Sequence, residues 1–335
     1  MKSRSLLAGC CAIAAVACAD PTEKRPQRAP PTAFRDTVER EPLKAIPQPP
    51  AIDGRLAALG RRLFHDKRLS SDQTIACSSC HDLANGGDDG RPRSLGVQGK
   101  LGGVNAPTVF NAGLNFVQFW DGRATTLEDQ VNGPVTHPLE MNSSWEDVVS
   151  NVKRDAEYAV AFSALYADGV SADNIRKSIA AFERTLLTPG APFDRWLAGN
   201  TGALTATQRA GYELFKSVGC VACHQGANVG GNMFQRFGVF GDYFKDRGNI
   251  TEADYGRFNV THNESDRFVF RVPSLRMVAH TAPYFHDGSA RTLTQAVQVM
   301  AKYQLGRNLS AEQVESIVAF LESLSQPGPA LAVAR

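Results

Sequence analysis

The sequence predicts a mostly α-helical protein built from two tandem domains, because one arrangement of residues occurs twice along the chain. In each half an amphipathic segment ends in Gly-x-x-Leu-Phe, and Cys-x-x-Cys-His follows it, first at residues 77–81 and then at residues 220–224. A further amphipathic segment comes later in each half. A helix, a cysteine–histidine motif, loops and a closing helix therefore form a unit that the chain repeats.

Length and composition agree with two globular domains. The chain has 335 residues, of which 43% are hydrophobic and 21% are charged, and we expect one domain at 51–200 and the other at 201–327. The formal net charge of +2 gives no case for a nucleic-acid partner or an anionic surface. After residue 20 no stretch is apolar for long enough to span a bilayer.

Residues 1–20 read as an export signal, with the basic "MKSR" before the apolar "SLLAGCCAIAAVA". The ending "AVAC" resembles a bacterial lipoprotein signal in which Cys18 is lipidated, and plain cleavage after "ACA" is the alternative. We therefore expect a periplasmic protein that is either free or lipid-anchored through Cys18. The Pro-rich stretch 21–50 is expected to be a tether.

The cysteines indicate covalent haem. Of the seven, three belong to the signal and four to the two motifs, so none remains for a disulfide framework. A thioredoxin-like pair would need a βαβ setting, which is not visible, and zinc would not require a His after each pair. Haem attachment uses two thiols and the adjacent His. We expect two c-type haems, on Cys77, Cys80 and His81 and on Cys220, Cys223 and His224.

The helices that flank the motifs have regular apolar faces. The first helices are expected at 53–66 and 205–217, and the second begins with Thr205 and Gln208 at the spacing of a capping box. The closing helices are expected at 173–187 and 310–324. This order of helix, haem motif, loops and closing helix is the layout of a small cytochrome c domain, and the fold we predict is two such domains in tandem.

The long segments between each motif and its closing helix should hold the distal side of each haem. Met300 lies where a cytochrome c domain usually supplies its axial Met, although a Met at this point can also be core packing. Met141 is its counterpart in the first half, and symmetry alone would make it a second axial ligand. The adjacent Glu140 suggests instead a carboxylate beside an open iron.

Several longer motifs resemble one known family. They are "RLFHDKRLS", "CSSCHDLANGG", "NAPTVFNAGLNFVQFWDGRA", "GPVTHPLEM" and "TAPYFHDGSARTLTQAV". In this order they look like the bacterial di-haem cytochrome c peroxidases, a family that includes the methylamine-utilisation di-haem enzymes. The resemblance runs from about Leu56 to Leu324.

The resemblance implies a division of labour between the haems. The first haem matches the peroxidatic haem, where hydrogen peroxide binds, with Glu140 as the catalytic carboxylate and Gln130 as its polar companion. The second matches an electron-accepting haem with Met300 as distal ligand, and Trp120 matches a tryptophan on the route between them. The family also holds calcium between its domains. The matching ligands are the Asn105 side chain and the Thr281 and Pro283 carbonyls.

Two positions depart from the family or complicate it. Many members have a distal His on the oxidised peroxidatic haem, and Val97 stands at the matching position here. We therefore expect an open or water-bound, high-spin ferric haem without reductive activation. His137 lies near the same pocket and is interpreted as a loop residue, a second acid–base group or a replacement ligand. Met300 favours the peroxidase branch, because the methylamine-utilisation enzymes have a Tyr there.

The leading hypothesis is therefore a di-haem cytochrome c peroxidase. It would reduce hydrogen peroxide to water with electrons from a small redox protein such as a cytochrome c or a copper protein. The alternatives are a high-valent haem oxidase acting on a protein substrate and a di-haem electron carrier. Family members are often homodimers, and a homodimer is compatible with this sequence.

Overall fold

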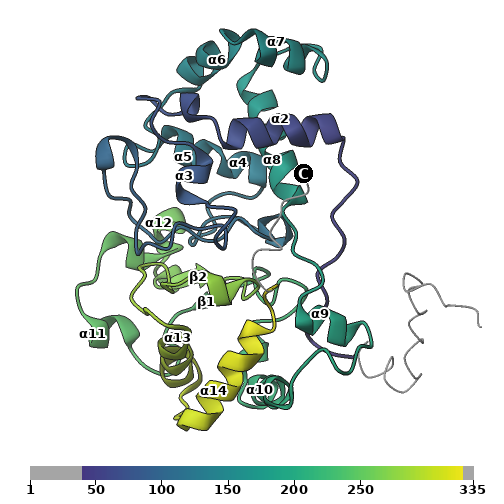
Figure 1. The fold of residues 1–335 in the computed structure, drawn as a ribbon. Coiled ribbons are helices and arrows are strands. Elements are labelled where there is room, and N and C mark those ends of the chain that lie inside the picture. The colour runs from purple at the N-terminus through teal and green to yellow at the C-terminus, as the bar shows by residue number, and fades with distance from the viewer. Residues whose placement is uncertain (1–39, 327–335) are drawn as a thin grey trace, which may run out of the picture.

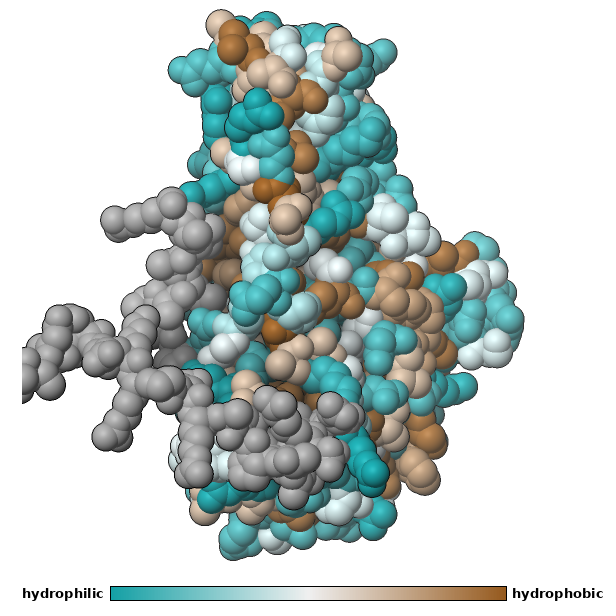
Figure 2. Space-filling model, turned by 90° about the vertical axis from the view of Figure 1, so that its right-hand side faces the viewer, coloured by the Kyte–Doolittle hydropathy of each residue, from teal (hydrophilic) through white to brown (hydrophobic). Residues whose placement is uncertain are grey.

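The computed structural model describes residues 40–326. The expected export signal, Cys18 and most of the expected tether lie outside the described residues. Within residues 40–326 no helix is both long and apolar enough to cross a membrane. On the face in Figure 2, hydrophilic residues cover most of the upper lobe, while hydrophobic residues gather around the middle of the molecule.

The described chain is mostly helical, as predicted, and forms an upper and a lower lobe (Figure 1). The upper lobe carries the helices of the first half: α2 (Gly54–Phe64), α3 (Cys77–Cys80), α4 (Leu127–Gln130), α5 (Asn132–Thr136), α6 (Trp145–Lys153), α7 (Ala156–Ser163) and α8 (Ala172–Thr185). The helices that follow are α9 (Pro192–Leu197), α10 (Ala206–Ser217), α11 (Tyr243–Arg247), α12 (Phe258–Thr261), α13 (Leu293–Val299) and α14 (Ala311–Glu322). One antiparallel pair joins β1 (Phe234–Arg236) to β2 (Val269–Arg271), with Phe234 opposite Arg271.

Each lobe is built on a close crossing of its first and closing helices. An ideal Cβ on Gly60 of α2 would lie 1.9 Å from the Ser178 carbonyl oxygen of α8, and one on Gly211 of α10 would lie 1.8 Å from that of Ser316 on α14. Only glycine permits such an approach. The Gly-x-x-Leu-Phe repeat thus marks the same helix contact in both halves.

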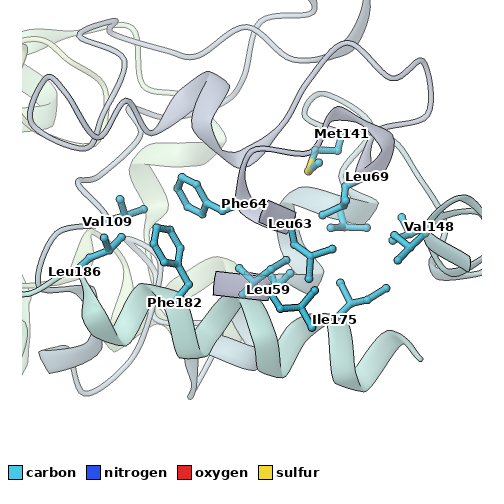
Figure 3. Packing of buried hydrophobic residues seen from close by; sticks show 14 of the residues in the cluster. Leu59, Leu63, Phe64, Leu69, Val109, Met141, Val148, Ile175, Phe182 and Leu186 are labelled. Carbon is cyan, nitrogen blue, oxygen red and sulfur yellow. The ribbon is translucent and has the colours of Figure 1, made fainter. Parts of the chain in front are cut away.

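The core of the upper lobe lies along the crossing of α2 and α8 (Figure 3). Leu59 and Phe64 of α2 meet Phe182 of α8, and the rings of Phe64 and Phe182 pack edge to face with centroids 5.4 Å apart. Met141 packs in the same cluster beside Leu69. The apolar faces predicted for these helices are the faces that the structure buries.

The core of the lower lobe gathers α10, α14 and two segments from before residue 201. The rings of Tyr212 on α10 and Phe320 on α14 lie 5.0 Å apart, and Phe193 of α9 packs on both. Leu43 is fully buried in the same cluster. Residues of the expected tether and of the expected first domain therefore contribute to the second core.

The capping box predicted at Thr205 and Gln208 is confirmed. The Thr205 hydroxyl accepts a hydrogen bond from the Gln208 N–H, and the Gln208 side-chain oxygen accepts one from the Thr205 N–H. These two bonds form a capping box at the start of α10. Ser310 and Gln313 form the same box on α14. These boxes satisfy backbone donors that a helix start leaves free.

Candidate active site

The first cysteine motif forms the short helix α3 and the residue after it. Cys77 and Cys80 are free thiols, and burial raises the pKa of Cys80 to about 11. The ring Nδ1 of His81 lies 3.1 Å from the carbonyl oxygen of Gly87. When Nδ1 donates to that carbonyl, Nε2 is left with its lone pair free to bind a metal.

The second motif repeats this arrangement. Cys220 and Cys223 are free thiols, and burial raises the pKa of Cys220 to about 12. The Nδ1 of His224 lies 3.3 Å from the Val229 carbonyl oxygen. Burial lowers the pKa of His224 to about 4, so the ring is neutral and can act as a ligand at neutral pH.

Each motif opens into a cavity that fits a covalently held haem. The first holds about 1250 Å³ of empty space, counted with its opening, and Cys77, Cys80 and His81 lie in its wall. The second holds about 1670 Å³, with Cys220, Cys223 and His224 in its wall. Mostly apolar side chains complete both walls. Two neutral thiols, an imidazole with one free nitrogen and an apolar slot are what a c-type haem requires.

Glu140 and Gln130 both line the first cavity. The Glu140 side chain is 40% exposed, and a carboxylate oxygen lies 3.7 Å from Nδ1 of His137. Burial of this carboxylate in the cavity wall raises its pKa, while the nearby charges of His137 and Arg123 act in the opposite direction. A carboxyl group beside an open cavity can take up and release a proton, which is the property a general acid–base catalyst needs.

Val97 lies directly against Glu140. It is fully buried, and its N–H donates to the Glu140 carbonyl oxygen at 2.8 Å. The preceding Gly96 lines the first cavity. The position expected to carry a distal His in other family members is therefore adjacent to the cavity wall, and an aliphatic side chain stands there.

The two methionines considered from the sequence lie in different cavities. Met300 lines the second cavity together with His224, at the start of a π-helical turn (Met300–Gln304) that continues α13. Met141 is buried in the upper core and also contributes to the wall of the first cavity. Glu140 and Gln130 line only the first cavity, so the two cavities differ in their polar lining.

A polar joint connects the halves beside the second cavity. The Trp120 indole N–H donates to the Asn105 carbonyl oxygen at 2.9 Å, and the Asn105 side-chain nitrogen donates to the Pro283 carbonyl oxygen at 2.6 Å. The Asn105 side-chain oxygen is buried without a partner. Asn105, Thr281 and Pro283 all line this cavity. An unpartnered side-chain oxygen and backbone carbonyl oxygens are the kinds of ligand that suit a hard cation such as calcium.

Sequence reasoning missed a buried ionic network beside this joint. His286 Nε2 lies 2.7 Å from an Asp254 carboxylate oxygen, and Arg247 forms ion pairs with Asp254 and Asp287. Burial raises the pKa of Asp254, but hydrogen bonds from His286 and Arg247 outweigh it and hold the pKa well below its usual range. Because Arg247 pairs with both carboxylates, this cluster is an ion-pair network. No sequence signal connected Asp254 to the motif that contains His286.

Sequence reasoning also passed over two buried charged residues in the cavity walls. Glu183 of α8 lines the first cavity, and burial raises its pKa to about 8. Arg271 ends β2 and lines both cavities. Glu183 lies on a helix face that was interpreted only for its apolar residues, and Arg271 lies in a stretch without a motif.

Comparison with known proteins finds relatives that are described as cytochrome c peroxidases. A model described as di-haem cytochrome c peroxidase matches residues 55–202. Cytochrome c peroxidase Ccp of Escherichia coli K12 is 49% identical over 89% of this chain, and the match spans 65% of that protein's length. Cytochrome c551 peroxidase of Nitrosomonas europaea is 45% identical over 86% of this chain and 84% of the relative.

More distant relatives include proteins described as MauG or MauG-like. Methylamine utilization protein MauG of Methylophilus methylotrophus is 33% identical over 80% of this chain and 82% of that protein. Among solved structures, a MauG-like protein associated with microbial copper homeostasis superposes with a TM-score of 0.77 at 28% identity, over 87% of this chain and 96% of the other. This structure supports the helical fold.

Proposed function

The chain belongs to the di-haem cytochrome c peroxidase family, and from that premise we propose that it reduces hydrogen peroxide to water with electrons from a small redox protein. The difference between the two cavities carries this proposal. The first cavity has a carboxyl group, Glu140, and a hydrogen-bonding amide, Gln130, and the second has the soft ligand Met300. Peroxide would therefore react in the first cavity, and electrons would enter through the second.

Cys77, Cys80 and His81 would hold a haem in the first cavity, and that haem would supply the redox chemistry for peroxide reduction. Glu140 moves the proton: its carboxylate takes a proton from one peroxide oxygen and returns it to the other, which leaves as water. The Gln130 amide can orient the peroxide by hydrogen bonding. Two electrons and two protons complete the reduction of one peroxide to two waters.

The electrons have a short route between the cavities. Phe119 lines the first cavity and Trp120 lines the second, although they are adjacent in the chain. The Trp120 indole is held by its hydrogen bond to Asn105. We assign the electron route to Trp120, and the donor would be a one-electron carrier such as a cytochrome c or a copper protein.

Calcium bound at the joint between the halves would hold the residues around Trp120 in place. Its ligands would be the Asn105 side-chain oxygen and the carbonyls of Thr281 and Pro283. The support is the unpartnered Asn105 oxygen, which no donor among the described residues satisfies. We further propose a periplasmic location from the export signal at residues 1–20, with lipidation at Cys18 as the anchored form. A homodimer is the assembly we propose.

The decisive experiment measures peroxide turnover by the fully oxidised holoprotein, with reduced cytochrome c as donor and no pre-reduction. Immediate donor oxidation that Glu140→Gln abolishes is the expected result, since Val97 offers no ligand to close the site. A lag removed by one-electron reduction would mean that another ligand, with His137 as the first suspect, closes the iron. Absence of turnover in both states would reject the peroxidase proposal and favour a protein substrate or an electron carrier.

A further inference from the structure

Arg271 is a buried cation between the two cavities. Its residue is 3% exposed, and it lines both cavity walls. Five residues do so (Ala106, Pro107, Thr108, Asn115 and Arg271), and Arg271 is the charged one among them. Within residues 40–326 no Asp or Glu forms an ion pair with it. Buried Arg276, in contrast, pairs with Asp194 at 2.9 Å.

The backbone of the first half fixes the Arg271 side chain. Its N–H donates to the Trp120 carbonyl oxygen at 2.8 Å, and its Nε donates to the Phe119 carbonyl oxygen at 3.1 Å. These bonds hold the base of the guanidinium to the two residues that divide the cavities. Both terminal nitrogens, Nη1 and Nη2, remain available for another acceptor.

An arginine in this position needs an anion. Burial lowers the pKa of Arg271 to about 10, so the guanidinium is still charged at neutral pH. An unpaired buried charge is strongly unfavourable, and proteins place such a charge where a partner neutralises it. The described residues provide no carboxylate for Arg271, and a group that fills the cavities can supply the anion.

We propose that Arg271 is a shared counter-ion for both haems and binds one propionate carboxylate of each through its terminal nitrogens. This inference rests on the two-haem site of the proposed function. A guanidinium presents several N–H groups in a planar fork and can bind two carboxylates, which the single ammonium of a lysine cannot match in geometry. The positive charge stabilises the ferrous over the ferric form of each haem, and it therefore raises both reduction potentials.

The test compares the two reduction potentials in holoprotein variants, by spectroelectrochemical titration without peroxide. Arg271→Gln is expected to lower both potentials by at least a tenfold change in each equilibrium constant, which is about 59 mV for one electron. Arg271→Lys should lower them less. The matched control is Arg257→Gln, which removes the same charge from a nearby residue that packs over the Phe234 ring and lines neither cavity.

The outcomes are separable. Unchanged potentials in Arg271→Gln, or a shift no larger than in Arg257→Gln, would overturn the proposal, and a shift of only one haem would overturn the shared role. The haem count of each variant is measured by pyridine haemochrome, and thioether bonds retain haem even when the counter-ion is lost. If Arg271→Gln fails to fold, Arg271→Lys decides, because loss of the fork should still lower both potentials. Failure of the proposed function would show separately, as wild-type protein without peroxide turnover.

Discussion

The pKa of Glu140 is raised by one effect and lowered by another, so the result of removing either effect can be predicted. Burial raises its pKa, whereas His137, 3.7 Å away, and Arg123 lower it. As a base, Glu140 must be ionised before it can take a proton, so the rate rises with pH through its pKa. Replacing His137 with Gln removes one lowering charge, and the acid limb of kcat/KM for peroxide should move to higher pH.

The measurement is a pH profile of kcat/KM, which reports the pKa of the free enzyme. Glu140→Gln serves as the reference, with the limb absent and a rate lower by about 10²- to 10⁴-fold. An acid limb that stays in place in His137→Gln would separate His137 from the titration of Glu140. A limb that moves to lower pH would reverse the assigned sign.

Val97 is the second residue whose chemistry can be tested alone. It is fully buried beside Glu140, and it has no atom that can bind iron. Val97→His should convert the ferric first haem towards low spin and introduce a lag before turnover, because imidazole would close the open position. The matched control is Val97→Leu, which adds volume without a ligand and should keep the high-spin spectrum. If Val97→His keeps a high-spin spectrum and turns over peroxide without a lag, position 97 is not the site of a distal ligand.

At the scale of elements, the helix crossings lead to a third prediction. Gly60→Ala and Gly211→Ala each push a Cβ into the carbonyl of the facing helix, at 1.9 and 1.8 Å. Overpacking of this kind costs about 1–3 kcal/mol, and contact with rigid backbone favours the upper end of that range. Chemical unfolding of the holoprotein should show a lower free energy of unfolding in both variants.

The control for the crossings is Gly54→Ala at the start of α2. Its added Cβ would meet nothing within 4 Å, and alanine is a better helix former by about 1 kcal/mol at most. Gly54→Ala should therefore be neutral or slightly stabilising. Equal stability of Gly60→Ala, Gly211→Ala and the parent protein would mean that the helix pairs can separate at little cost.

The helices were predictable because their signals are local. Apolar spacing located the faces that carry Ile175 and Ile317, and the capping pair of Thr205 and Gln208 located the start of α10. The placement of one segment was less predictable. Residues 41–46 were expected within a tether, but Leu43 is buried against the second core and the Tyr212 hydroxyl donates to Glu41 at 2.6 Å. Composition indicates a Pro-rich linker, but it cannot show which apolar residue of the linker packs against a core.

At the scale of the whole molecule, the site depends on contacts between distant segments. The cysteine motifs could be read from the sequence, because spacing alone defines them. Arg271 and Asp254 could not, since their partners are at Phe119 and His286 and only the folded chain brings them together. The roles of Glu140 and Trp120 came from family resemblance, because a lone carboxylate or aromatic residue has no local signature.

The joint between the halves supports the last prediction, which concerns removal of metal. Asn105 of the first half binds the Pro283 carbonyl of the second, and its backbone carbonyl holds Trp120. An ion that binds only the folded joint stabilises it by about 2.7 kcal/mol at one hundred times its Kd. Chelation of calcium should therefore lower the Tm of the holoprotein and slow electron transfer between the haems, and added calcium should restore both.

Asn105→Ala distinguishes this site from any other calcium site. The variant lacks the side-chain oxygen that is unpartnered in the fold, so its Tm should already be low and should respond little to a chelator. Asn85→Ala, at an exposed position, is the matched control and should respond as the parent does. If the chelator lowers the Tm of Asn105→Ala by as much as that of the parent, the ion binds elsewhere. Trp120 would then be positioned by the protein alone, because its bond to the residue 105 carbonyl does not need the side chain that was removed.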